Sequence, residues 1–326
     1  MTDNHKNKLE AMPKVVMEEI LKSCNYVDIQ SLLKSCRRIR DLVDLINPDP
    51  KINRIGLLLW SDTVHLILGC SDGSETRINY FSDTGGCCVQ KKGVESFKYM
   101  SNVTLSDLLR QDFKILKTSI DNHNLELMEF TVIFQEDALP TYLSSITFSL
   151  LEQPYLRVML LILAYKGQPR PMAVLPFVLP QYMIIRAASN QQNVINLEPL
   201  AELAQFRNLQ GFTIKGFRVD NPRHLIYSDS ETLLNRISPE DAMFLKETFR
   251  NSPTFKSCEI GLDNIDNISE VLRAIVPNAE EDAIQGAWYF TTTTPGKLLC
   301  IIFVGTTMYF CTVDIANMVE WVVFVE

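Results

Sequence analysis

The first helix of the chain can be read from the spacing of its apolar residues. Val16 and Ile20 are four positions apart, as are Met17 and Leu21, and this is the spacing of residues on one side of an α-helix. Pro13 precedes both pairs at a position that a first helical turn tolerates. The pattern predicts a helix from Pro13 to Cys24.

Two further short helices are expected before residue 50. Asp28 can cap the second, and the third ends where two prolines, Pro48 and Pro50, interrupt the pattern. The three helices form a predicted domain over residues 12–47. Such a unit has about 35 structured residues, and a hydrophobic core of that size gives little stability. We therefore expect the unit to be stabilised by contacts with a partner or with the next domain.

From residue 51 the pattern changes to short apolar runs separated by turn residues. Runs that begin at Ile52, Val64 and Thr76, with Ser71-Asp72-Gly73 as a turn, predict a small antiparallel sheet. From about residue 103, helices and strands alternate. The predicted helices are Leu105–Ile120, Pro140–Leu151, Pro199–Phe206, one opened by Ser238-Pro239, and Ile268–Ile275. The predicted strands are Leu127–Phe134, Arg157–Leu163, Tyr182–Arg186, Gly211–Gly216, Phe255–Ile260, 287–293, 298–304 and 308–313.

The spacing of these strands predicts the fold class. Strand centres lie about 24 to 44 residues apart, and each interval can hold a helix with its loops. We therefore expect an α/β protein in which a small all-helical N-terminal domain precedes an irregular leucine-rich-repeat-like α/β domain over residues 51–326. Antiparallel strands are expected at the start and at the C-terminal end of that domain. A closed parallel α/β sheet is the alternative, since no strict repeat recurs.

Composition and charge narrow the classes of function. Apolar residues make up 46% of the 326 residues, which excludes a disordered chain. The 39 acidic and 31 basic residues give a net charge of −8, whereas a nucleic-acid binder is normally basic. The first 50 residues hold equal numbers of acids and bases, so the imbalance belongs to the remainder. The larger domain is expected to receive a basic protein partner.

No feature of the sequence points to secretion or to a membrane. The eight cysteines have no C-x-x-C spacing and are typical of reduced thiols. Residues 1–10 lack the apolar core of a secretory signal. The most apolar runs, Val158–Ala164 and Leu298–Val313, are shorter than the roughly 20 residues of a membrane helix. We expect a cytoplasmic or nuclear protein that contacts neither membrane nor nucleic acid.

Catalytic and cofactor motifs are missing from the sequence. Phosphate-binding loops, dinucleotide fingerprints, zincin motifs and nucleophile elbows have no match, so neither a cofactor nor a metal is expected. Cys87 and Cys88, with His65 or His123, could be imagined as a nucleophile or as half a metal site. A loop at Gly85-Gly86-Cys87-Cys88 with buried or unreactive thiols is the favoured interpretation.

Two segments resemble known domains. The first is carried by Met12-Pro13, Val16-Met17, Ile20-Leu21, Asp28-Ile29, Leu32-Leu33 and Cys36–Leu42, and it looks like an F-box over residues 12–46. The second is carried by Ser238–Ser252 and Phe255–Ile260, with an earlier half over Leu156–Pro176 and Ile184-Ile185, and it is similar to the FTH domain of the large nematode F-box family.

This resemblance implies a function without catalysis. An F-box docks on the Skp adaptor of an SCF-type cullin–RING ubiquitin ligase, and the downstream domain captures a protein substrate, here unknown, for ubiquitin-dependent degradation. The positions that match the adaptor-contacting motif are Pro13, Ile20, Leu21, Asp28, Leu32 and Cys36.

The residues themselves leave alternatives open. Ile20, Leu21 and Leu32 could equally form the core of the helical domain, and Asp28 could serve only as a helix cap. The chain could also be a ligase-independent interaction scaffold with a vestigial F-box. An enzyme that uses Cys87 or Cys88 is the third hypothesis.

Overall fold

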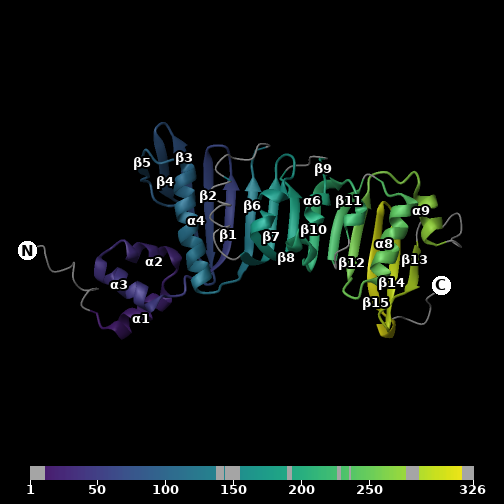
Figure 1. Cartoon of the computed structure of the whole chain (residues 1–326), viewed down its shortest axis with the longest axis horizontal. Helices are drawn as coiled ribbons and strands as arrows, with labels where there is room; N and C mark the ends of the chain where they lie inside the picture. Colours follow the sequence, from purple (N-terminus) through teal and green to yellow (C-terminus); the bar gives the residue numbers. More distant parts are fainter. Residues whose placement is uncertain are drawn as a thin grey trace, which may run out of the picture. The chain divides into compact units, whose positions relative to one another are not determined.

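The chain folds as two compact units. The computed structural model in Figure 1 describes residues 12–136, 143, 155–188, 193–225, 229–234, 236–276 and 286–317. One unit contains residues 1–130 with 140–157, and the other contains residues 131–139 with 158–326. The predicted helix over Pro140–Leu151 lies outside the described residues except for Leu143.

Three helices open the first unit, as the sequence predicts: α1 (Lys14–Ser23), α2 (Tyr26–Leu33) and α3 (Arg37–Ile46). The prediction that Asp28 caps α2 is wrong. The Asn25 side chain accepts the Val27 and Asp28 N–H groups, each at 3.1 Å, and Asp28 accepts the Asn25 N–H at 3.3 Å. This is a capping box in which Asn25 is the cap and Asp28 its third-residue partner, so α2 begins two residues earlier than Asp28.

An antiparallel sheet follows the helices in the first unit. Its strands are β1 (Ile52–Leu59), β2 (Thr63–Cys70), β3 (Glu75–Asp83), β4 (Gly86–Lys91) and β5 (Lys98–Ser101), and each pairs with the next. The predicted turn at Ser71–Gly73 is confirmed, with Gly73 at φ 82°. The prediction of a loop at Cys87-Cys88 is wrong, because Asp83 pairs with Gly86 and the chain re-enters the sheet as β4.

Helix α4 (Leu105–Asn122) packs against this sheet in the first unit (Figure 1). Thr104 caps it by accepting the Asp107 N–H at 3.1 Å. Its buried stripe includes Leu109, Phe113 and Leu116. Tyr80 of β3 donates a hydrogen bond of 2.8 Å to Asp112 of α4, which joins helix to sheet.

The second unit contains a run of parallel strands. The division between the units falls within β6 (Leu127–Phe134) and β7 (Leu156–Tyr165). Beyond β7, the parallel strands are β8 (Val178–Ala187), β10 (Gly211–Val219), β11 (Asp229–Leu234) and β12 (Ser257–Leu262), and the short β9 (Val194–Ile195) pairs with β10. The sequence missed β11, which lies inside the longest predicted interval.

Antiparallel strands end the second unit, as predicted. They are β13 (Gly286–Thr291), β14 (Lys297–Val304) and β15 (Thr307–Asp314), with β15 paired to β12. The predicted helix Pro199–Phe206 is instead two short helices, α6 (Glu198–Ala201) and α7 (Ala204–Arg207). Leu203 between them is extended, with φ −76° and ψ 130°, and this breaks the helical path. Single-turn helices occur at Pro171–Ala173, Leu175–Phe177, Pro222–His224 and Ile315–Asn317.

Helices α8 (Pro239–Asn251) and α9 (Ile268–Ile275) pack together in the second unit. Phe249 of α8 stacks on Phe255 with ring centroids 4.0 Å apart and meets Phe310 of β15 edge-on at 5.2 Å. Lys246 links the two helices by donating to the Ile275 carbonyl at 2.8 Å. The chain is thus a mixed α/β protein, a helical segment followed by a large region of sheet.

Candidate functional site

Helix α1 carries apolar residues on two sides. Met17 and Leu21 face inward and are fully buried. Val16 is 43% exposed, and Ile20, one turn further along the same side, is half-buried. A surface helix normally shows one apolar stripe and a polar opposite face. The second stripe, Val16 and Ile20, is named the outward stripe below, and it gives α1 apolar surface that is not used by the core.

The structure divides the six residues predicted to contact an adaptor. Leu21, Leu32 and Cys36 come together: Leu21 belongs to a core with Ile29, Ile39 and Val43, while Leu32 and Cys36 are partly buried against it. Pro13, Ile20 and Asp28 are not members of that cluster. The Leu21 side chain has no exposed surface, so it is a core residue in this structure.

Pro13 and Asp28 have local roles at helix starts. Pro13 is exposed and stands as the N-cap of α1, where its carbonyl accepts the Val16 and Met17 N–H groups at 3.0 and 3.1 Å. Asp28 is exposed and holds the first turn of α2 through the capping box. Both positions leave side-chain surface open to a second molecule.

Two exposed apolar residues of the segment were not singled out from the sequence. Val15 is 68% exposed and Leu45 of α3 is 67% exposed. Their types and spacing match those of buried positions, so periodicity alone does not mark them. The sequence does contain one signal of exposed apolar surface, because α1 has more apolar residues than a single buried stripe requires.

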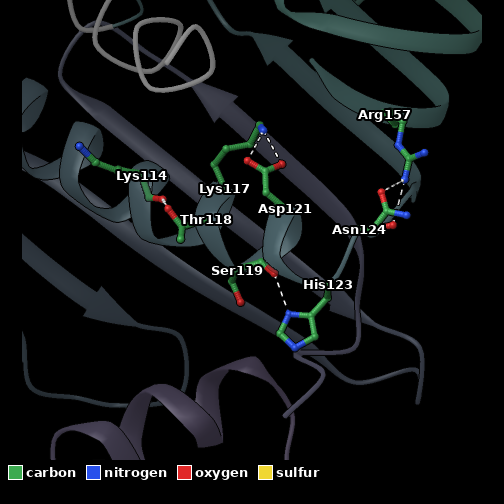
Figure 2. Close-up of polar contacts among 8 residues, drawn as sticks. All are labelled: Lys114, Lys117, Thr118, Ser119, Asp121, His123, Asn124 and Arg157. Carbon is green, nitrogen blue, oxygen red and sulfur yellow. Dashed lines mark hydrogen bonds and ion pairs between the residues drawn. The ribbon is translucent and has the colours of Figure 1, made fainter. Parts of the chain in front are cut away.

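The end of α3 is attached to α4 by His123. Figure 2 shows His123 at the C-terminal end of α4, with Nδ1 2.9 Å from the Ser119 carbonyl oxygen. Its Nε2 lies 3.1 Å from the carbonyl oxygen of Asn47, the left-handed C-cap of α3. Both ring nitrogens of His123 therefore lie within hydrogen-bond distance of a backbone carbonyl oxygen. The Tyr26 N–H also donates to the Pro50 carbonyl at 3.1 Å, which closes the start of α2 against the connecting segment.

A buried ion pair supports the same end of α4. Lys117 is only 2% exposed, and its ammonium lies 2.5 and 2.6 Å from the two carboxylate oxygens of Asp121 (Figure 2). Next to it, Arg157 donates to the carbonyl and side-chain oxygens of Asn124 at 2.9 and 2.7 Å. Lys117 lies in the last two turns of α4, toward the end of the helix where the helix dipole favours positive charge.

The thiols give no catalytic arrangement at Cys87. This residue is fully buried, its thiol donates to the Val103 carbonyl at 2.9 Å, and burial raises its pKa, which disfavours the reactive thiolate. In the second unit, Cys300 and Cys311 face each other across β14 and β15. A hydrogen bond between these thiols holds the pKa of Cys311 below, and that of Cys300 above, the usual range of a thiol. Strand register, which the sequence does not reveal, makes this pair.

The described part of the chain contains neither a metal-binding cluster nor a membrane-spanning helix. No three His, Cys, Asp or Glu side chains there are grouped so that they could hold a metal ion. Over the same residues, no helix is both long enough and apolar enough to cross a membrane.

Comparisons with known proteins identify two domains. Residues 9–51 match the F-box domain and residues 149–278 match the FTH domain. No curated protein matches the chain. A solved structure, a propionate kinase from Francisella tularensis subsp. tularensis SCHU S4, is similar over 29% of this chain with 15% identity and a TM-score of 0.19. The chain spans 28% of that kinase, and a likeness this distant carries no argument about fold or activity.

Proposed function

Because this chain belongs to the F-box proteins that carry an FTH domain, we propose that it is a substrate-recognition subunit of an SCF-type cullin–RING ubiquitin ligase. In this proposal the F-box docks on a Skp-family adaptor, and through it on a cullin, while the FTH-containing region holds a target protein. The chain supplies no chemistry itself. It brings the target close to the ubiquitin-transferring subunits, and proximity then accelerates the transfer.

The outward stripe on α1 is the single observation that carries the adaptor-binding part of this proposal. An interface between helices needs a few apolar side chains that are exposed in the free protein and buried in the complex. Ile20, with Pro13 at the start of the same helix, meets that need. We assign direct contact to Pro13 and Ile20 and edge contact to Leu32 and Cys36, which are partly exposed.

Leu21 and Asp28 then support adaptor binding indirectly, by holding the helices in place. Leu21 fixes α1 against α2 and α3 from inside the core, and Asp28 closes the first turn of α2. Their replacement would weaken adaptor binding by loosening the helices that present the outward stripe.

The proposed division of labour follows the sequence boundaries. Residues 12–47 form the adaptor-binding module, and residues 51–326 form a leucine-rich-repeat-like interaction domain. The parallel register of β8, β10, β11 and β12, with helices in the connections, supports the second assignment. The proposed location, cytoplasm or nucleus, is where such a ligase would act on its targets.

Co-expression with a Skp adaptor tests the proposal. We expect wild type to be recovered in a stoichiometric complex, and Ile20→Asp to lose it, because a charge would be buried at the interface. Met172→Asp is the matched control, since Met172 is 40% exposed and lies in the second unit. Circular dichroism establishes that each variant is folded.

Two results would contradict the proposal. Wild type that is folded but forms no complex would favour the ligase-independent scaffold with a vestigial F-box. A complex that survives Ile20→Asp as well as it survives Met172→Asp would remove the outward stripe from the interface.

A further inference from the structure

A shallow groove of about 610 Å³ runs along the outer side of α8 in the second unit. Arg223 comes from the single-turn helix Pro222–His224, and all other lining residues come from α8 or its C-cap. The groove is lined by Arg223, Glu240, Met243, Phe244, Glu247, Thr248, Asn251 and Ser252. These α8 positions repeat every three or four residues on the side opposite the buried Ala242, Leu245 and Phe249. The groove, called the α8 groove below, therefore follows one open helix face.

The floor of the α8 groove is apolar and held in place. Phe244 is 38% exposed, and Met243 beside it is half-buried. The Arg223 guanidinium carbon lies 5.3 Å from the Phe244 ring centroid, and the Arg223 Nε lies 2.7 Å from an Asp241 carboxylate oxygen. Asp241 in turn accepts the Ser238 hydroxyl at 2.9 Å. The hydrogen bonds from Ser238 to Asp241 and from Arg223 to Asp241 hold the Arg223 guanidinium against the Phe244 ring. Phe244 is therefore positioned before a partner binds.

The rim of the α8 groove is acidic. Glu240 and Glu247 are seven residues apart, about 10 Å along the helix, and stand on either side of the apolar floor. Arg223 is already paired with Asp241. Arg250 approaches Glu247 at 3.7 Å, but both side chains are more than a third exposed, and such a pair is weak. A negative field at both ends of an apolar floor favours a partner of opposite charge.

We propose that the α8 groove binds a short segment of a partner protein in which a large apolar side chain is flanked by lysine or arginine on both sides. The apolar side chain packs on Met243 and Phe244, and the flanking cations meet Glu240 and Glu247. This inference rests on the proposed function, for which it supplies the class of substrate: a protein with an exposed basic-apolar-basic segment. Glu240 and Glu247 belong to the part of the chain beyond residue 50, in which acidic residues outnumber basic ones.

Fluorescence anisotropy with labelled peptides tests the proposal on the purified full chain. The first probe is a peptide with a central leucine-phenylalanine pair and two lysines on each side. The second replaces the lysines by glutamates, and the third replaces the apolar pair by alanines. We expect the first peptide to bind at least roughly tenfold more tightly than either of the others, and to bind more weakly as salt is raised.

Variants of the groove locate the binding. Glu240→Gln with Glu247→Gln should weaken the first peptide about tenfold, and Phe244→Ala should weaken it without changing its salt dependence. Glu198→Gln with Glu270→Gln removes two exposed glutamates elsewhere in the same unit and should leave affinity unchanged. Equal affinity for the lysine and glutamate peptides, or an equal loss in the control pair, would overturn the proposal.

The groove variants also separate this inference from the proposed function. Because the α8 groove and the outward stripe lie in different units, the groove variants should still be recovered with the Skp adaptor. Adaptor recovery without peptide binding by wild type would contradict the groove alone. Peptide binding without adaptor recovery would contradict the ligase assignment alone.

Discussion

Truncating Leu21 should open the helical segment while the sheet of the first unit stays folded. Leu21 is one of four buried residues in a small core, with partly buried apolar residues around it, so Leu21→Ala leaves a cavity in the middle of that core. Such a change costs about 3 kcal/mol, and a core of this size rarely supplies more than about 3–5 kcal/mol. The variant therefore removes most of the local stability of α1, α2 and α3.

Hydrogen exchange followed by mass spectrometry measures this effect by segment. A loss of about 3 kcal/mol lowers the protection of the amides in α1–α3 by roughly 100-fold. Peptides from β1, β2 and β3 should keep their wild-type protection. Val15→Ala is the matched control on the same helix, because Val15 is 68% exposed and its truncation should leave the exchange rates nearly unchanged.

Either of two results would refute this reasoning. If Leu21→Ala exchanged like Val15→Ala, Leu21 would carry no core energy. If protection fell equally in α1–α3 and in β1–β3, the helices and the sheet would unfold as one cooperative block, and the small core would not set the local stability.

Three further predictions concern polar groups inside the fold. The buried Thr232 hydroxyl has no hydrogen-bond partner among the described residues, so Thr232→Val should raise the free energy of unfolding by about 1 kcal/mol in urea titrations; a loss would reveal a partner. Burial raises the pKa of Asp112 despite the opposing hydrogen bond from Tyr80. The protonated Asp112 therefore contributes its full share to the free energy of unfolding below the unfolded pKa of 3.8, and this share is lost as pH rises through the folded pKa. Asp112→Asn, which keeps an acceptor for Tyr80, should therefore stabilise the protein at pH 7 and not at pH 3, and equal effects at both would contradict this. Asp121→Ala should cost about 3 kcal/mol, because it removes a carboxylate that pairs with the buried Lys117. Adding Lys117→Met should recover part of that loss in a double-mutant cycle; additive costs would show that the two charges do not interact.

Local chemistry made much of the fold predictable. Ser238 followed by Pro239 marked the start of α8, and the structure places the cap and the first helical residue there. The strand Leu127–Phe134 was predicted with its observed bounds, because its apolar run is flanked by polar turn residues. Caps and strand runs depend on neighbours in sequence, which is why they can be read directly.

Elements that depend on distant partners were the ones missed. Strand β4 begins at Gly86, and only its pairing with β3 shows that Cys87 and Cys88 belong to a sheet. Strand β11 starts with Asp229-Ser230-Glu231, a polar run that becomes a strand because β10 and β12 lie on either side of it. Periodicity carries no information about such neighbours.

The candidate site shows the same limit. Val16 and Ile20 have the same spacing as Met17 and Leu21, and both pairs are apolar, so sequence alone assigns neither pair to the core. Only the packing of α2 and α3 against one side of α1 separates them. The α8 groove was likewise beyond the sequence, because Arg223 reaches Phe244 from a separate turn.

The connection between α3 and β1 limits how far the helical segment can move from the sheet of the first unit. Helix α3 ends at Ile46 and β1 begins at Ile52, and two of the residues between them are prolines. Even fully stretched, so short a tether spans only about 20 Å, and its prolines restrict rotation. A Skp adaptor that grips the helices thereby also fixes the starting point of the sheet region. In the proposed complex, this sheet would therefore stay within a short distance of the adaptor instead of moving on a long flexible linker.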